Sequence, residues 1–575
     1  MISLRRAKSC YFGQDVSSDG QRSFRFGKFF PQLHWSSGRA TWVKPRPRAY
    51  AVFIAILAWT TLGWATTLSV RIQDEAGSAT PARVYLTDSN GRSHFPPQTI
   101  QYRKSHGGFS ENHFVPPDGT FSIDLAAGTY QLRIERGKEC LPIDQQIVVP
   151  SSAKVVKVFK LRRWVHMAGL GWYSGDMHVH ASLRDVVPLM QAEDLNITLP
   201  ITLWRMETSA PSRDTELAKY LEKADDSGSL PAGKDRFFTV INEELETASS
   251  ALLISRLRRH ALPLEYPMAQ LAKTAREHGA LVDSEKATSL EFPVIVATGQ
   301  CNFVGLANNH FWRSGCYLDP WGSWPDLLPQ HFPNDCSGFA TAGFDLYYAL
   351  LNMGFHLEPS AGSAFGVHPV PLGWSRVYVH VKGKFDPESW FLALEEGHSF
   401  VTTGPMILLK VNGLEPGEEY HGRNFPLSVT ISLEILAPDP SQQAEIIVNG
   451  AVYPITLLPE SGRRYAYQGK MSLSLEGSSW IAARWLEKEG DTASVAHTAP
   501  VYFWDRDLPI PIPQSDAQYF LKRVERLKGE VESGNSEIGV GPTTILTPTG
   551  NLRNQTLDFL NQALGVFRAK AQQSR

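Results

Sequence analysis

The pattern that most restricts the fold is an alternation of two kinds of segment between about residues 163 and 405. Apolar, strand-like segments such as "ITLPITLW" alternate there with helical patterns such as "MAQLAKTAREHG" and "GFDLYYALLNMG". Such alternation predicts an α/β fold with a largely parallel sheet or barrel. Two further segments are predicted as strands: "VIVATGQCNFVGLANN", which is apolar, and "RFFTVINEEL", which ends in acids.

Two stretches that contain only strand patterns flank this segment. Residues 66–162 and 406–505 show alternating apolar and polar residues separated by turn sequences such as "SNG" and "NG", which is typical of β-sandwiches. Residues 506–575 contain two helical patterns, and we expect them to pack against the rest of the chain. The predicted fold class is therefore multidomain α/β plus β, with an α/β domain at 163–405, two flanking β-sandwich domains and a helical C-terminal tail.

The N-terminal 65 residues carry most of the positive charge. They contribute +8 to a net charge of −2, which leaves −10 for the remainder. A basic segment, "VKPRPRAY", precedes the apolar run "AVFIAILAWTTLGWA", the pattern of a secretory signal peptide. We expect export to the periplasm, the cell surface or the medium; the alternative is an uncleaved membrane anchor. The acidic remainder argues against a nucleic-acid partner, and no integral membrane partner is implied.

The five cysteines fit an exported protein that does not depend on disulfides. Cys316 and Cys336 bracket a long loop and could form a disulfide, whereas Cys140 and Cys301 are expected to be isolated, buried thiols. The spacing excludes a Cys/His zinc finger. The sequence also lacks a P-loop, a GxGxxG opening a helix and a GxSxG elbow, which argues against nucleotide, dinucleotide and serine-hydrolase functions.

The sequence "GWYSGDMHVH" carries the strongest chemical signal. Asp176, His178 and His180 occupy alternate positions of a predicted strand, so their side chains share one face, with neighbouring Cα atoms roughly 6.5–7 Å apart. Neutral imidazole is a common metal ligand, and Asp176 could orient one of the rings. The pattern predicts a metal site; the alternative is a polar strand end without function.

Further polar clusters follow other apolar runs. In "INEELE", Glu243 and Glu244 point to opposite faces of a strand, so at most one enters the same cleft. A carboxylate there could bridge two cations or accept a proton from water; the alternative is an acidic surface turn. His310 in "GLANNHFWR" could be a ligand or a packed ring. In "LVDSEK", Asp283, Glu285 and Lys286 could supply a ligand or a substrate contact; the alternative is a surface salt bridge.

A substrate-binding region is predicted beside these clusters. Residues 309–339 form a long loop, and loops of this length inside compact domains usually bind or cover something. Its aromatic residues suit a sugar ring or an aryl group; the alternative is that they cover a neighbouring β domain. Gly362 and Gly366 would let the backbone approach another group closely. The candidate substrate contacts are Lys286, Asn309, Trp312, Arg313 and His368.

The motif "GDMHVH" and the order of the later clusters resemble the PHP (polymerase and histidinol phosphatase) metal-dependent hydrolases, and more narrowly the CehA/McbA type. "GLANNHFWR", "AGSAFGVHPVPLGWSRVYVHV" and "GHSFVTTGPM" also carry the resemblance, which covers roughly 165–415. It implies a distorted barrel of about seven strands with two or three divalent ions that activate water against a phosphoester, an ester or a carbamate. His178 and His180 match the first metal motif, Glu243 is favoured as the acid, and His310 as a further ligand.

Two departures from that family bear on the metal content. The chain has "LVDSEKA" where these enzymes commonly show His-Pro, and Ala364 stands where an acid is expected. We therefore predict one or two ions, Zn²⁺ or Mn²⁺, with Glu243, Glu244 and Asp176 as catalytic carboxylates. The alternatives are a metal-poor protein that binds a glycan or small ligand at the cell surface, and a surface protein whose sandwiches scaffold an assembly.

Overall fold

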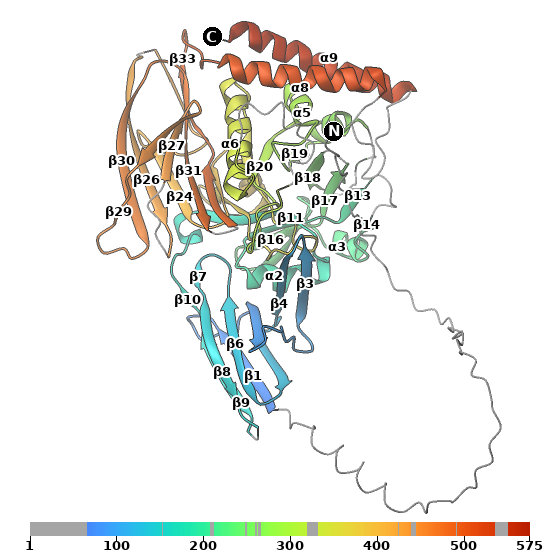
Figure 1. The fold of residues 1–575 in the computed structure, drawn as a ribbon, viewed down its shortest axis with the longest axis vertical. Coiled ribbons are helices and arrows are strands. Elements are labelled where there is room, and N and C mark those ends of the chain that lie inside the picture. The colour runs from blue at the N-terminus through green and yellow to red at the C-terminus, as the bar shows by residue number, and fades with distance from the viewer. Residues whose placement is uncertain are drawn as a thin grey trace, which may run out of the picture. The chain divides into compact units, whose positions relative to one another are not determined.

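The computed structural model (Figure 1) is described here for part of the chain: residues 66–151, 153–206, 212–247, 250–258, 262, 266–318, 332–423, 425–438, 444–489, 492–534 and 550–574. The predicted leader and signal peptide at 1–65 lie outside these residues. So do Trp321, Trp324 and His331 of the long aromatic loop.

The N-terminal β region consists of two sheets around one apolar core. The sheets have the strand orders β5-β1-β9 and β3-β4-β2-β6-β8, and β7 pairs with β10 beside them. Leu68, Val84, Phe114 and Leu132 lie in their shared core. The strands are β1 (Thr66–Gln73), β2 (Arg83–Asp88), β3 (Ile100–His106), β4 (Phe109–Val115), β5 (Thr120–Leu125), β6 (Gly128–Glu135), β7 (Cys140–Leu141), β8 (Ile143–Val149), β9 (Val155–Lys160) and β10 (Arg162–Arg163).

The central region alternates strands with helices, as the sequence predicts. Its strands are β11 (Trp172–Val179), β12 (Ile197–Pro200), β13 (Leu203–Met206), β14 (Ser212–Arg213), β15 (Ser229–Gly233), β16 (Arg236–Thr239), β17 (Ile241–Glu246), β18 (Ala251–Leu257), β19 (Leu281–Ser284), β20 (Phe303–Ala307), β21 (Glu358–Ala361), β22 (Arg376–His380) and β23 (Ser399–Thr402). Its helices are η1 (Ala168–Leu170), α2 (Leu183–Ala192), α3 (Leu217–Leu221), α4 (Met268–Glu277), α5 (Phe292–Ala297), α6 (Cys336–Asn352) and α7 (Pro387–Glu395). Gly279 and Gly354 follow α4 and α6 with positive φ, which lets the chain leave each helix.

The central strands form parts of two sheets. One has the order β14-β13-β17-β18-β19-β20-β21, and the other contains β15-β16-β12-β11-β22-β23. Most helix-connected neighbours, such as β11 and β12 or β20 and β21, are parallel. β18 is antiparallel to both β17 and β19, so the seven-stranded sheet is mixed.

Two strand predictions need correction. "VIVATGQCNFVGLANN" begins in the helix α5 and becomes a strand only at Phe303; Pro293 stands in the first turn of that helix, where its missing N–H costs nothing. "RFFTVINEEL" is not one strand, because β16 and β17 belong to different sheets and the chain crosses between them at Val240.

The C-terminal β region also packs two sheet surfaces around an apolar core, formed by residues such as Ile407, Ile431 and Trp485. One sheet has the order β24-β26-β30-β29. The other continues the central sheet, because β23 pairs with β32 and the order runs on through β31, β27 and β28. The strands are β24 (Met406–Val411), β25 (Glu419–Gly422), β26 (Leu427–Leu436), β27 (Ala444–Val448), β28 (Ala451–Ile455), β29 (Leu458–Pro459), β30 (Ala466–Leu475), β31 (Ser479–Glu489), β32 (Thr492–Thr498) and β33 (Val501–Asp505).

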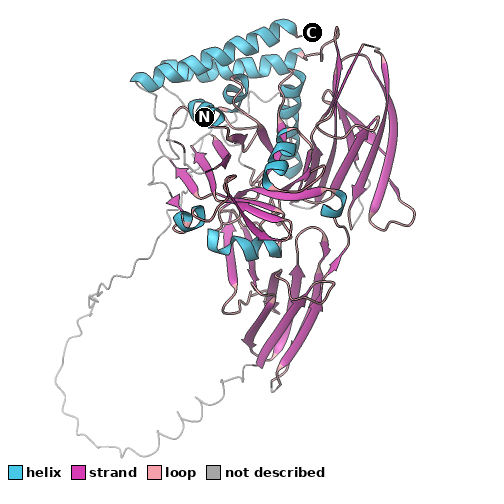
Figure 2. Ribbon diagram, turned by 180° about the vertical axis from the view of Figure 1, so that it is seen from behind, coloured by secondary structure: helices cyan, strands magenta, loops and turns pink. Residues whose placement is uncertain are grey.

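The C-terminal tail contains α8 (Gln514–Ser533) and α9 (Gly550–Gln573), which lie side by side (Figure 2). They pack on α5 and α6, which confirms the prediction that the tail returns to the rest of the chain. The buried guanidinium of Arg523 in α8 donates hydrogen bonds to the backbone oxygens of Thr288 and Ser289. Among the described residues, no helix combines the length and the hydropathy needed to cross a bilayer.

Candidate metal centre

The end of β11 carries the two histidines of the "DMHVH" motif. Asp176 holds this strand end in place rather than orienting a ring: its carboxylate accepts hydrogen bonds from the backbone N–H groups of His178, Ser363 and Gly373 at 3.1, 3.0 and 2.7 Å. The hydroxyl of Ser363 donates a further bond at 2.5 Å. These bonds fix β11 to the segment that follows β21.

The two glycines that were predicted to permit a close backbone approach lie against this same strand end. A Cβ at Gly362 would lie 2.4 Å from Cβ of His178, and one at Gly366 would lie 2.4 Å from the backbone oxygen of His180. Both distances are far below ordinary carbon contacts. The absence of side chains at these positions therefore lets the segment after β21 support both histidines.

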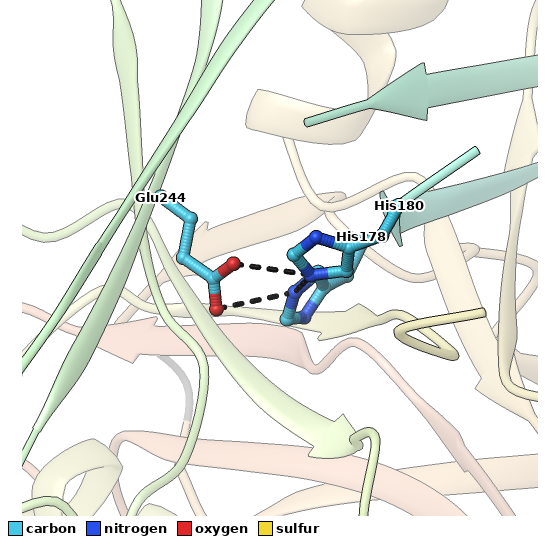
Figure 3. Close-up of side chains that lie close together, drawn as sticks. All are labelled: His178, His180 and Glu244. Atoms are coloured by element: carbon cyan, nitrogen blue, oxygen red, sulfur yellow. Dashed lines mark hydrogen bonds and ion pairs between the residues drawn. The ribbon is translucent and has the colours of Figure 1, made fainter. Parts of the chain in front are cut away.

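Glu244 on β17 faces the two imidazoles (Figure 3). Its Oε1 lies 3.2 Å from Nε2 of His178, and its Oε2 lies 3.1 Å from Nε2 of His180. The two Nε2 atoms are 3.0 Å apart. Three ligand atoms from two strands thus converge on one point, and the side chains are nearly inaccessible: His178, Glu244 and His180 are 1%, 4% and 10% exposed.

The carboxylate of Glu285 and the ammonium of Lys286 lie on the Nδ1 side of His178. Glu285 follows β19, and its Oε1 lies 3.1 Å from Nδ1 of His178. Its Oε2 accepts from Nζ of Lys286 at 2.5 Å, and both residues are at most 3% exposed. The second ring nitrogen of His178 is therefore held by a carboxylate, an arrangement that fixes ring orientation in metal sites.

The charges of the cluster are strongly coupled. Burial disfavours a charged His178, yet Glu244 and Glu285 outweigh burial and raise its pKa to about 10. Burial also opposes ionisation of Glu244, but the two histidines lower its pKa to about 2. Burial lowers the pKa of His180, and the charge of His178 adds to this effect. The carboxylates thus favour a positive charge at this point of the structure.

Two further acids show that the site is rich in negative charge. Burial, together with Glu244 and Glu285, raises the pKa of Glu246 to about 8. Burial and Glu285 raise the pKa of Asp283 to about 7. Burial is the largest cause of each shift and the neighbouring carboxylates add to it, so a cation bound nearby would favour the ionised forms.

The geometry of the three ligands fits a divalent ion. In a tetrahedral zinc site, ligand distances of about 2.0–2.1 Å place neighbouring ligand atoms about 3.3 Å apart. The two Nε2 atoms are 3.0 Å apart, and each lies 3.1–3.2 Å from a different oxygen of Glu244. His178, His180 and Glu244 could therefore hold a metal ion.

The other two predicted ligands lie elsewhere. Glu243 points away from Glu244: its Oε2 lies 3.2 Å from Nη2 of Arg205, and its Oε1 accepts from the N–H of Leu262 at 2.8 Å. His310 is fully buried and stacks on Phe339, with ring centroids 5.3 Å apart. The structure brings neither residue into the group of three.

Three of the predicted substrate contacts, Asn309, Trp312 and His368, lie together. Nδ2 of Asn309 lies 3.4 Å from Nε2 of His368. The ring centroids of Trp312 and His368 are 5.4 Å apart. Burial and the charge of Lys286 lower the pKa of His368 to about 3. Arg313 instead points to the N-terminal β region, where it pairs with Glu135 at 3.1 Å.

Two residues near the centre were missed by the sequence reasoning. Trp204 on β13 packs on His180 with centroids 4.6 Å apart and donates to Glu246 at 3.2 Å. His106, at the end of β3, lies against Trp312 and Tyr317 with ring centroids 5.7 and 5.0 Å away. The parallel register that places Trp204 opposite Glu244 would have identified the first; nothing in the sequence links His106 to the central region.

Comparison of the chain with protein-family models gave no match, and comparison with curated proteins gave none either.

Proposed function

We propose that this chain is an exported, metal-dependent hydrolase of the PHP type, related to the CehA/McbA enzymes, that cleaves an ester, a carbamate or a phosphoester. His178, His180 and Glu244 would hold one divalent ion, Zn²⁺ or Mn²⁺. The observation that carries the proposal is the convergence of three side chains: the two Nε2 atoms lie 3.0 Å apart, and each lies 3.1–3.2 Å from one oxygen of Glu244.

The placement of the polar residues along the strands supports a barrel-like catalytic domain. The histidines end β11, Glu285 follows β19, His310 lies beyond β20 and Gly362 follows β21. Sites in α/β folds lie at the carboxyl ends of strands. β21 also contacts β11 and β22 of the other central sheet, as expected where strands close towards a barrel.

A bound divalent ion supplies Lewis-acid chemistry, activating water and polarising the bond to be cleaved. Among the residues of the chain, Asp176 and Gly362 hold the strand end that carries the ligands. Glu285 fixes the ring of His178, and the buried ammonium of Lys286 holds the carboxylate of Glu285 in place. Trp204 packs on His180 and excludes water from that side.

Metal analysis of the purified full chain tests the ligand set. The wild-type protein should bind about one equivalent of Zn²⁺ or Mn²⁺, and His180→Ala and Glu244→Gln should bind much less. Glu243→Gln is the matched carboxylate control, and His421→Ala, a histidine 70% exposed on the surface, is the matched imidazole control. Both should retain the metal. Metal loss in Glu243→Gln but not in Glu244→Gln would refute the assignment.

An activity panel tests the hydrolase class. Aryl esters, carbamates and phosphoesters should be hydrolysed by the metal-loaded protein, and His178→Ala should abolish turnover. Ala364, at the position where an acid is expected, favours a second candidate, a metal-poor protein that binds a glycan or small ligand without catalysis. Substoichiometric metal after reconstitution, together with no turnover on any member of the panel, would support that second function.

The disulfide supports the proposal of export. Cys316 and Cys336 are bonded, as the sequence suggested, and such bonds persist in oxidising compartments. Cell fractionation with an antibody against the C-terminal tail would test the location: recovery in the cytosolic fraction would contradict export.

A further inference from the structure

A second cavity lies apart from the metal centre. It has a volume of about 580 Å³, within the range of small-molecule sites, and none of the three metal-centre residues lines it. Residues from all three β-containing regions form its walls. We call it the tryptophan cavity, because Trp164, Trp374 and Trp485 line it together with Lys138 and Arg376.

Two of the acids that line the tryptophan cavity are already compensated. Glu135 and Glu193 both pair with Arg83. Glu135 also pairs with Arg133 and Arg313. These carboxylates therefore have cations of their own and leave little negative charge for the other basic residues of the cavity.

Lys138 and Arg376 have no such partner. Nζ of Lys138 donates to the backbone oxygen of Thr403 at 2.5 Å and lies 4.5 Å from the ring centroid of Trp374. Arg376 donates through Nε to the backbone oxygen of Gly373 at 2.7 Å. Within the described part of the chain, neither cation lies within ion-pair distance of a carboxylate. Two cations thus share one cavity with only neutral acceptors.

The electrostatics of Lys138 support this description. Burial, followed by the positive charges of Arg376 and Arg83, holds the pKa of Lys138 well below its usual value. Burial and the neighbouring cations thus disfavour the charged form of Lys138, and an anion that enters the cavity would favour it. The backbone also preserves the arrangement: Gly373 has φ of +64°, and a Cβ there would lie 2.8 Å from Nη2 of Arg376.

We propose that the tryptophan cavity binds a small organic anion. Its carboxylate or phosphate group would be held by Lys138 and Arg376, and its flat or apolar body would pack on the three tryptophans. Charge-assisted hydrogen bonds account for the anionic end, and indole rings supply apolar area and face-on contact for the other. The one remaining acid of the lining, Glu487, would face the body of the ligand rather than its anionic end.

Isothermal titration calorimetry on the full chain tests this proposal. The protein is first treated with a chelator, so that the metal centre cannot ligate an anion. The probes are benzoate, phenyl phosphate, inorganic phosphate and the neutral benzyl alcohol, each up to about 10 mM. We expect one site for benzoate or phenyl phosphate, with the better of the two identifying the anionic group, and no binding of benzyl alcohol.

The variants place the binding at the tryptophan cavity. Lys138→Met should weaken binding of the anionic probe by about 10- to 100-fold, the loss of one charge-assisted hydrogen bond. Lys138→Arg keeps the positive charge and should bind the anionic probe more tightly than Lys138→Met does. Lys384→Met, at a lysine whose side chain is 86% exposed, is the matched control and should bind normally. If Lys138→Met does not fold, Trp374→Leu takes its place and should also weaken binding. Equal binding by wild type and Lys138→Met, or no binding of any probe to wild type, would overturn the proposal.

Discussion

Gly362 offers the most direct test of how the metal centre is built. A methyl group there would lie 2.4 Å from Cβ of His178 and 2.9 Å from its backbone nitrogen. Carbon atoms pack at about 3.5–4.0 Å, so Gly362→Ala must move β11 or the opposing segment by about 1 Å. The φ of Gly362 is not positive, so the effect is steric rather than a matter of backbone preference.

The expected cost has two parts. Overpacking of this kind destabilises a protein by about 1–3 kcal/mol. Metal–ligand distances must also stay within about 0.2 Å of their preferred values. A shifted His178 should therefore lower metal affinity by about 10- to 100-fold, the range seen when a residue that supports a metal ligand is changed. Urea unfolding of the chelated protein measures the first part, and competition with a chelating dye measures the second.

Gly343→Ala is the matched control for this experiment. Gly343 lies within α6, and no atom lies within 4 Å of the position its Cβ would take. The substitution should stabilise the protein by about 0.5–1 kcal/mol and leave metal affinity unchanged. If Gly362→Ala unfolds within about 0.5 kcal/mol of wild type and binds metal as tightly, the close approach of the two backbones does not determine the site.

Three further predictions concern stability. Arg523→Met removes the buried hydrogen bonds to the loop after Lys286 and should lower the free energy of unfolding by about 2–4 kcal/mol. Arg523→Lys should lower it less. Equal urea midpoints for wild type and both variants would show that these hydrogen bonds do not stabilise the fold. Burial and Glu419 raise the pKa of Glu358 to about 8, so its folded state prefers the neutral carboxyl and stability should fall between pH 4.5 and 8. Glu358→Gln should therefore lose less stability than wild type over urea titrations in that range, and parallel curves would contradict the assignment. Cys316→Ser with Cys336→Ser opens a bridge with a sequence separation of 20 and should cost about 3 kcal/mol at 25 °C, which wild type with reductant should reproduce.

Local signals sufficed for much of the fold. Glycines 279 and 354 end the helices that the sequence predicts, and the alternation of apolar and polar residues identifies both β regions. The helix Phe292–Ala297 was predicted as a strand because six apolar residues in a row carry no period that separates the two structures. The sequence does not reveal that the chain crosses between sheets at Val240. Both β16 and β17 have the residue pattern of a strand, and only long-range pairing assigns them to different sheets.

In the candidate site too, local sequence patterns identify some residues and only long-range pairing identifies the others. The spacing of His178 and His180 places both rings on one face, so the sequence alone brought them together. The choice between Glu243 and Glu244 depends on which face of β17 meets β11, and that follows from the pairing of β17 with β13. Glu285 could be predicted as a ligand, a substrate contact or a surface ion pair. Glu285 is buried against His178, a residue remote in the sequence, and no local pattern records that contact.

The pairing of β23 with β32 makes the central and C-terminal regions share one hydrogen-bonded sheet. Melting the C-terminal strands alone would remove one of the two strand partners of β23 and leave a row of unpaired amides along that edge. The two regions should therefore lose their structure in a single cooperative step. A cation that binds only the folded centre would then raise the melting temperature of strands that never touch it.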